Sequence, residues 1–250
     1  MGKAKKESFD PRMFPLLCHR GLHGEGVTEN GLRSFALARE KSLPFELDVH
    51  LSKDGHLVVC HDSSLLRTTG KEGIIEELKV SQIKSDYRLL DGEEVPTLVE
   101  VLAENDEAVP VVIELKPYKG NHRLLAKCLK NELSLIKDKR KYAIISFDPR
   151  ALLPLKGLGV NRGLLVGRER TYVLLFRHLF EFLCPEEGLL FDRRVARYRK
   201  KGGVLDIWTL QSEEEIASFR DKADILTFQF LPEDALNRLL QEPSSPDEAN

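Results

Sequence analysis

Apolar runs of strand length alternate with helix-like segments along most of the chain, and this alternation limits the folds that the sequence can adopt. The strand-like runs are LLCH, FELDVHL, VVIELK, AIISF, RGLLV, GLLFD, VLDIWTL and DILTFQ. The helix-like segments, with apolar residues at helical spacing, are NGLRSFALARE, LVEVLAEN, HRLLAKCLKNELSLI, PRALLPLKGL, TYVLLFRHLFEFL, RRVARYRKKG, SEEEIASFR and PEDALNRLL.

Such an alternation predicts parallel strands that are joined by helical crossovers. Eight units in a chain of 250 residues favour a closed (β/α)₈ barrel, an α/β fold, over the alternative of an open doubly wound sheet. We expect one domain over residues 1–242 and a disordered acidic tail over residues 243–250.

One further strand-like run, HLVVCHD, follows FELDVHL after only Lys53-Asp54-Gly55. A parallel crossover needs about a dozen residues, so this run is predicted to fold back as an antiparallel hairpin. The glycine-containing, charged segment from Leu65 to Pro96 comes next, and we expect it to form a loop extension over the mouth of the barrel.

The charge of the chain is nearly balanced, with 38 Lys and Arg against 40 Asp and Glu. This balance predicts no nucleic-acid partner. No run reaches the roughly 18 to 20 apolar residues of a membrane span, and MGKAKKESFD lacks the apolar core of a secretion signal. We therefore expect a cytoplasmic protein without stable membrane insertion. The sequence specifies no oligomeric state.

Cysteines are few and scattered, at Cys18, Cys60, Cys128 and Cys184. Their spacing fits neither a zinc site nor a disulfide scaffold, so we expect reduced, buried thiols. Two of them directly precede histidines, but strand alternation turns both thiols toward the helices and away from the barrel mouth. A nucleophilic role is therefore not predicted.

Acidic residues share one face of the strand-like run FELDVHL. Alternation places Glu46, Asp48 and His50 on the face opposite to the apolar residues, and VVIELK adds Glu114 in the same way. Barrel strands are covered on both faces, so three inward carboxylates need a partner. The pattern indicates an all-oxygen site for one hard divalent cation, Mg²⁺ or Ca²⁺. The alternative is a carboxylate cluster paired with Lys116 and Arg20.

Two histidines are predicted beside this cluster. His19 ends the first strand-like run and should open onto the barrel mouth. If Asp54 and Gly55 are the central residues of a two-residue turn, His61 lies directly opposite Asp48 and shares its face. A structural, hydrogen-bonded role is the competing interpretation of each histidine, but their convergence on the carboxylates favours acid and base catalysis.

These groups suit phosphodiester cleavage, which needs charge neutralisation at the phosphoryl oxygens and proton transfers at the attacking and leaving oxygens. Arg20 and Lys116, with the cation, provide the first, and His19 and His61 provide the second. Trp208 is predicted either to pack against the non-phosphate part of a substrate or to belong to the core.

Residues just before the first helix-like segment are predicted to have a structural role. Thr28-Glu29-Asn30 can cap the helix, and Glu29 is also a candidate to support the cation site.

Several motifs together resemble the glycerophosphodiester phosphodiesterase family. They are HRG, TEN, FELDVHLSKDGHLVVCHDSSLLRTTG, PTLVEVL, VVIELK, ISFDP and IWTL, in the order of the family. The resemblance runs from His19 to Trp208. Near the carboxyl end, ILTFQF replaces the usual strand that ends in Thr-Asn or Thr-Asp before a proline.

The resemblance implies a (β/α)₈ barrel that hydrolyses glycerophosphodiesters to glycerol 3-phosphate and an alcohol. By motif position it implies metal binding by Glu46, Asp48 and Glu114, and acid and base roles for His19 and His61. It also implies phosphate contacts from Arg20 and Lys116. The first attack can come from the glycerol hydroxyl of the substrate or from water. The alternatives are a lysophospholipase D-type enzyme and a phosphate-binding barrel without turnover.

Overall fold

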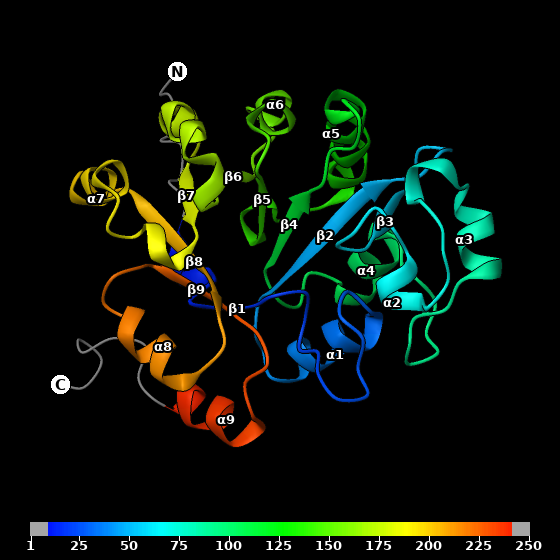
Figure 1. Cartoon of the computed structure of the whole chain (residues 1–250), viewed down its shortest axis with the longest axis horizontal. Coiled ribbons are helices and arrows are strands. Elements are labelled where there is room, and N and C mark those ends of the chain that lie inside the picture. The colour runs from blue at the N-terminus through cyan, green and yellow to red at the C-terminus, as the bar shows by residue number, and fades with distance from the viewer. Residues whose placement is uncertain (1–9, 242–250) are drawn as a thin grey trace.

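Eight parallel strands close into a ring because β1 (Leu16–Cys18) pairs with both β2 (Phe45–Leu51) and β9 (Ile225–Phe228) (Figure 1). The computed structural model describes residues 10–241, except for the side chain of residue 135. The predicted (β/α)₈ barrel is confirmed. The tail predicted over residues 243–250 lies outside the described residues.

Within the described part of the chain, the ring is completed by β4 (Val111–Leu115), β5 (Tyr142–Ser146), β6 (Asn161–Val166), β7 (Phe182–Pro185) and β8 (Val204–Leu210). The α-helices are α1 (Leu32–Glu40), α2 (Leu66–Thr69), α3 (Val80–Asp86), α4 (Leu98–Asn105), α5 (His122–Glu132), α6 (Pro149–Leu152), α7 (Arg193–Lys200), α8 (Glu213–Phe219) and α9 (Glu233–Gln241). The 3₁₀ helices are η1 (Pro11–Met13), η2 (Ile75–Glu77), η3 (Leu133–Leu135), η4 (Lys139–Lys141), η5 (Leu153–Leu155), η6 (Arg168–Leu179) and η7 (Glu187–Leu189).

One predicted strand is misplaced. The run GLLFD overlaps η7 and contains no strand, and the sixth strand of the ring is instead β7, which begins at the end of the segment predicted as a helix. A short apolar run has no periodicity that separates a buried strand from a buried helix, which explains the error.

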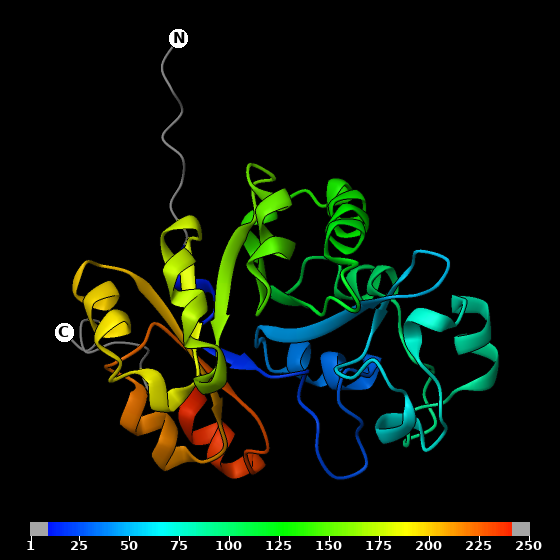
Figure 2. The same ribbon diagram turned by 45° about the horizontal axis from the view of Figure 1, so that its top comes forward.

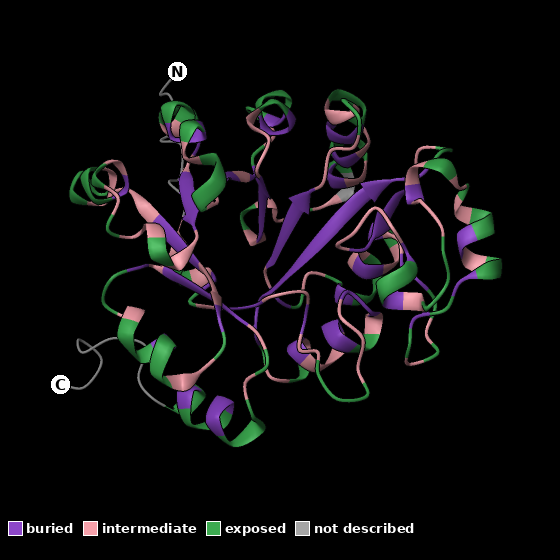
Figure 3. Cartoon of the chain, viewed as in Figure 1, coloured by how far each residue is buried: buried purple, intermediate pink, exposed green. Residues whose placement is uncertain are grey.

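Side chains of alternating residues form two apolar layers. Phe45, Leu47 and Val49 of β2 pack between the ring and its helices. Phe14 and Phe182 belong to a separate cluster that fills the interior of the ring. Figure 3 shows the strands as almost entirely buried and the helices as buried on one side only. This packing fixes which residues of each strand face the interior.

An antiparallel strand, β3 (Leu57–Val59), pairs with β2 outside the ring, so the predicted hairpin is present. The segment that follows it carries α2, η2 and α3, which lie to one side of the ring (Figure 2). Its apolar residues form a third cluster of their own, which contains Val58, Cys60, Ile75 and Ile83. The extension is therefore a small packed subdomain and not an open loop.

Among residues 10–241, no helix has both the length and the apolar character needed to cross a membrane.

Candidate active site

Three buried carboxylates converge inside the mouth of the barrel. The register of β2 and β4 pairs Asp48 with Glu114, and Glu46 lies one inward position before Asp48. One ligand oxygen from each carboxylate lies within 4.8 Å of the others. The three side chains come from residues that are at most 6% exposed. The face that strand alternation predicted is therefore the face that holds the cluster.

Two cations accompany these carboxylates. Lys116 Nζ lies 2.9 Å from Glu114 Oε1 and 3.2 Å from Asp48 Oδ1. Arg20 Nε lies 3.3 Å from Asp48 Oδ2, and the Arg20 backbone N–H donates to Glu46 Oε2 at 3.0 Å. The ion pairs that the sequence offered as the alternative to a metal site are thus present. When all three carboxylates are ionised, two cations leave one negative charge unbalanced in the cluster.

Two buried carboxylate oxygens of the cluster lack a hydrogen-bond donor among residues 10–241. Glu46 Oε1 and Asp48 Oδ1 accept no hydrogen bond from the part of the chain that is described, although Lys116 lies at ion-pair distance from Asp48. Burial, and then the charges of Asp48 and Glu114, raise the pKa of Glu46 well above its ordinary value. Burial also raises the pKa of Glu114 to about 7. A carboxyl group that resists ionisation in this way needs further positive charge.

The cluster fits a divalent cation. Carboxylate oxygens without a hydrogen-bond partner are the donor atoms that hard cations prefer. One oxygen from each of the three carboxylates lies close enough to the others for all three groups to reach one ion. Burial opposes ionisation of Asp48, but Lys116 and Arg20 outweigh it and hold its pKa low, so this carboxylate is already charged.

The two histidines have different hydrogen-bond partners. His19 Nδ1 lies 2.7 Å from Oε1 of Gln229, whereas His61 Nδ1 lies 2.7 Å from Oδ1 of Asp62. Burial, followed by the charge of Arg20, lowers the pKa of His19 to about 4. Burial also lowers the pKa of His61, against the opposing effect of Asp48. One ring is therefore supported by a neutral amide and the other by a carboxylate.

The predicted pairing of His61 with Asp48 is wrong by one residue. Val49 pairs with Val59, and the hairpin closes where the Ser52 N–H donates to His56 O at 2.9 Å. The loop therefore has three central residues instead of two, and continued pairing would turn His61 away from the carboxylates.

His61 nevertheless reaches the mouth, because β3 ends at Val59 and the chain then bends. His50 Nε2 donates to the His61 backbone oxygen at 3.1 Å, and His50 Nδ1 lies 2.6 Å from Glu76 Oε1. His50 thus joins the extension to the barrel and fixes the backbone of His61.

The residues before α1 were predicted to cap the helix. In the structure they support the site instead. The N-cap of α1 is Gly31. Asn30 Nδ2 donates to Asp48 Oδ2 at 2.9 Å. Glu29 accepts from Arg20 at 2.9 Å and from two nitrogens of Arg67 at 2.8 Å. Glu29 and Asn30 of the TEN motif therefore orient Arg20 and the carboxylate of Asp48.

A cavity of about 180 Å³ joins these groups at the mouth. Polar residues come from β1 to β4 and the residues that follow them, and also from β8 and β9; the apolar residues come from β5, β6 and β8 and from the residue that follows β5. Its lining is His19, Arg20, Glu46, His61, Glu114, Lys116, Ile145, Phe147, Leu165, Asp206, Trp208, Thr209 and Thr227.

Aromatic rings form the apolar part of this wall. The rings of Phe147 and Trp208 meet edge to face with centroids 5.6 Å apart, and Trp208 Nε1 donates to Cys184 O at 2.7 Å. Trp208 therefore has a fixed orientation and faces the cavity, where it can contact a substrate.

Asp206 was not among the predicted site residues, although it also lines the cavity. It accepts a hydrogen bond from Thr227 Oγ1 at 2.7 Å, and burial raises its pKa to about 7. Strand alternation predicts its inward position on β8, two residues before Trp208, but did not assign it a role in the site.

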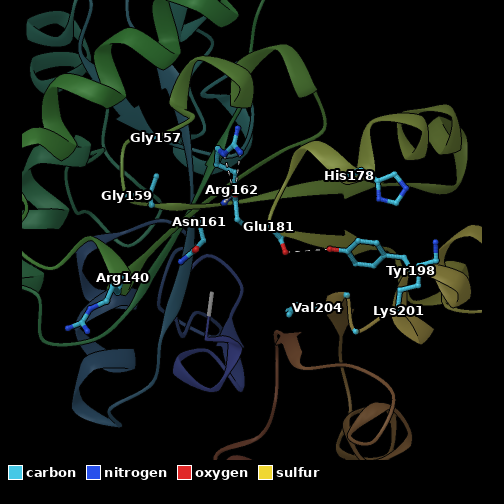
Figure 4. Close-up of a pocket in the computed structure, with 13 residues that line it drawn as sticks. Arg140, Gly157, Gly159, Asn161, Arg162, His178, Glu181, Tyr198, Lys201 and Val204 are labelled. Carbon is cyan, nitrogen blue, oxygen red and sulfur yellow. Dashed lines mark hydrogen bonds and ion pairs between the residues drawn. The ribbon is translucent and has the colours of Figure 1, made fainter. Parts of the chain in front are cut away.

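A second, larger cavity of about 970 Å³ lies at the opposite end of β6 and β8 (Figure 4). Its buried Arg162 pairs with Glu181 at 3.0 Å, and Tyr198 donates to the backbone oxygen of Glu181 at 3.4 Å. Because these opposite charges satisfy each other, the mouth is the better candidate for chemistry.

Comparisons with known proteins agree with this site. A sequence profile of the Glycerophosphoryl diester phosphodiesterase family matches residues 19–223. A glycerophosphodiester phosphodiesterase of Caldanaerobacter subterraneus subsp. tengcongensis is 31% identical over 217 residues, which cover 80% of this chain and 87% of that protein.

Solved structures are also similar. A glycerophosphodiester phosphodiesterase from Thermotoga maritima is 28% identical, with a TM-score of 0.70 over 86% of this chain and 94% of that one. An Oleispira antarctica phosphodiesterase in complex with the product sn-glycerol-3-phosphate is 23% identical, with a TM-score of 0.79 over 90% of this chain and 96% of that one. The second likeness concerns the fold alone.

Fold, site and relatives define an enzyme that cleaves phosphoric diesters. More narrowly, the chain belongs to the glycerophosphoryl diester phosphodiesterase family, as the sequence motifs predicted.

Proposed function

We propose that the protein hydrolyses glycerophosphodiesters to glycerol 3-phosphate and an alcohol, with a divalent cation, Mg²⁺ or Ca²⁺, held by Glu46, Asp48 and Glu114. The observation that carries this proposal is the cluster of three buried carboxylates, with unsatisfied oxygens, beside two histidines in one cavity. The Caldanaerobacter relative, named as a glycerophosphodiester phosphodiesterase, supports the substrate class.

The cationic side chains bind the phosphate. Arg20 and Lys116 both line the cavity, and each already faces a carboxylate, so their charges are fixed in place before substrate arrives. When bound, the divalent cation supplies additional charge neutralisation at the phosphoryl oxygens. Glu29 keeps the Arg20 guanidinium in this orientation through a hydrogen bond of 2.9 Å.

The histidines exchange protons with the substrate. One ring accepts the proton of the attacking hydroxyl, which belongs either to the substrate glycerol or to water, while the new P–O bond forms. Attack by water gives glycerol 3-phosphate directly, whereas attack by the glycerol hydroxyl gives a cyclic phosphodiester that water opens in a second step. The other ring donates a proton to the oxygen of the leaving alcohol as its P–O bond breaks. His19 and His61 both line the cavity, so each can reach one of these oxygens.

A lysophospholipid is the second candidate substrate, because Phe147, Leu165 and Trp208 give the cavity an apolar wall. In the extension, the cluster residues Val58, Ile75 and Ile83 are at most 1% exposed and are not accessible to an acyl chain. A barrel without turnover is disfavoured because the family is enzymatic.

We also propose a cytoplasmic location, supported by the free, unpaired state of Cys18, Cys60, Cys128 and Cys184.

The test is to follow product formation by ³¹P NMR with glycerophosphocholine, glycerophosphoethanolamine and lysophosphatidylcholine. Each substrate is assayed with Mg²⁺, Ca²⁺ or EDTA. We expect cation-dependent release of glycerol 3-phosphate from the two glycerophosphodiesters, and a loss of about 100-fold or more in His19→Ala and Glu114→Ala. Cleavage of lysophosphatidylcholine at the same bond would release lysophosphatidate. His178→Ala and Glu132→Ala, which lie outside the mouth, should stay active. Full activity of both site variants would contradict the proposal.

A further inference from the structure

Gln229 lies beside His19 because of the way the ring closes. β1 and β9 are parallel neighbours, and Cys18 pairs with Phe228, so His19 and Gln229 are the next residues in register (Figure 1). The His19 N–H donates to Phe228 O at 2.9 Å, and the Gln229 N–H donates to Leu210 O at 3.0 Å. Backbone hydrogen bonds therefore hold both residues at the carboxyl ends of their strands.

The side chain of Gln229 determines which nitrogen of His19 carries the proton. Gln229 Oε1 lies 2.7 Å from Nδ1, and an amide oxygen can only accept a hydrogen bond. Nδ1 is then the protonated nitrogen, and the lone pair of the neutral ring is on Nε2. The low pKa of His19 keeps the ring neutral near pH 7, so the choice of tautomer decides what the ring can do.

His61 differs because its partner is charged. Asp62 Oδ1 accepts from Nδ1 at 2.7 Å, and Asp62 is itself held by Arg67, whose Nε lies 2.6 Å from Oδ2. A carboxylate at this position favours the imidazolium form, in which Nε2 also carries a proton, and so opposes the burial that lowers the pKa of His61. The amide of Gln229 has no charge and gives His19 no such stabilisation.

We propose that Gln229 is a positioning residue that holds His19 as the Nδ1–H tautomer, so that Nε2 of His19 accepts the proton of the attacking hydroxyl. This inference rests on the proposed hydrolysis. A P–O bond forms as that proton moves to His19 Nε2. The bond from phosphorus to the leaving oxygen breaks as that oxygen takes a proton from His61 Nε2. The structure thus gives the two histidines separate roles.

Gln229 also gives a role to a motif that departs from the family pattern. It lies in ILTFQF, where this chain departs from the usual strand ending. Thr227, the preceding inward residue of β9, lines the cavity and donates to Asp206. The altered strand end therefore keeps inward polar residues, and the last of them supports a catalytic ring.

The experiment combines kinetics with NMR of protein labelled with ¹⁵N in its seven histidines. The His19 signals are assigned by their loss in His19→Ala. In the unmodified protein without substrate, we expect ¹⁵N shifts of an Nδ1–H tautomer. Gln229→Leu, which keeps the approximate volume but removes the acceptor, should give a mixture of tautomers.

The kinetics of Gln229 variants test its role as a positioning residue. Gln229→Leu should lower kcat about 10- to 100-fold, while KM stays within about threefold. This loss is part of the rate enhancement of about 10²- to 10⁴-fold that general base catalysis supplies. Gln229→Glu, whose carboxylate accepts the same hydrogen bond, should recover most of that loss. Gln211→Leu, an exposed glutamine at the end of β8, is the matched control and should behave like the unmodified protein.

An Nε2–H tautomer in the unmodified protein would overturn the inference, and so would an unchanged kcat in Gln229→Leu. The NMR result does not depend on turnover or on the stability of a variant. If the unmodified protein cleaves none of the glycerophosphodiesters, the proposed function fails, and the tautomer measurement still decides the role of Gln229.

Discussion

Asp48 and Glu114 are paired residues on neighbouring strands, so the barrel places two carboxylates side by side in its interior. Lys116 lies within 3.2 Å of both, yet Glu46 adds a third carboxylate whose Oε1 has no hydrogen-bond donor among the described residues. A cation bound in this cluster would therefore compete with protons for the same buried oxygens.

Cation binding should strengthen as pH rises from 6 to 8. The pKa values of Glu46 and Glu114 are raised, the latter to about 7, and both groups must release their protons before they bind a cation. The measurement is the shift in Tm on adding MgCl₂ or CaCl₂. A concentration of 100 times Kd corresponds to about 2.7 kcal/mol of stabilisation.

Variants identify the ligands in that experiment. Glu46→Gln should lose the cation-induced shift. Glu132→Gln removes a half-buried carboxyl on α5 whose pKa burial raises to about 7, and should keep the shift. Equal shifts at both pH values, or a full shift in Glu46→Gln, would argue against this site.

Asp206→Asn should stabilise the protein above neutral pH. Burial raises the pKa of Asp206 from its ordinary 3.8 to about 7, so between these values the folded protein keeps a proton that the unfolded chain has released. Stability is therefore lost as pH rises from about 4 to about 7. The variant lacks this loss and should gain about 1–4 kcal/mol at pH 8, at about 1.4 kcal/mol per pKa unit. Urea unfolding at pH 4 and pH 8 measures the difference, and a gain independent of pH would contradict it.

Asp62→Asn should lower kcat by about 10- to 100-fold with little change in Tm, because the imidazolium of His61 loses the charge that stabilises it. The control is Glu213→Gln, which breaks an exposed ion pair with Arg238 on distant helices. Steady-state kinetics on glycerophosphocholine distinguish the two. An Asp62→Asn variant as active as the control would show that His61 does not need its carboxylate.

Gly163→Ala should destabilise the barrel by about 1–3 kcal/mol, the usual cost of overpacking a core. A Cβ at Gly163 would overlap the ring of Phe182 and come within 2.9 Å of Cys184 Sγ on the neighbouring strand. Gly24→Ala, where an added Cβ meets nothing within 4 Å, is the matched control. Chemical denaturation compares them, and equal stabilities would show that β6 and β7 can separate to make room.

Alternation along single strands made the acidic cluster predictable. The apolar face of β2 is defined by Phe45, Leu47 and Val49, so the sequence alone places Glu46 and Asp48 on the other face. The order of strands and helices likewise predicts the barrel and hence the meeting of β2 with β4. These features depend on local patterns and on one rule of topology.

Features that depend on backbone detail were not predictable in the same way. The hairpin register changed by one residue because its loop has three central residues, and His61 reaches the mouth through a bend after β3. Gln229 and His19 are in contact although they lie 210 positions apart in the sequence. Only closure of the ring, together with the register of β1 and β9, brings these residues together.

The most direct test of the central claim is the rate of glycerol 3-phosphate release from glycerophosphocholine before EDTA, after EDTA, and after Mg²⁺ or Ca²⁺ is restored. We predict that EDTA abolishes release, that the cation restores it, and that Glu114→Gln is inactive throughout. A rate that chelation leaves unchanged in the unmodified protein, or undiminished activity of Glu114→Gln, would contradict a carboxylate-bound cation in this reaction.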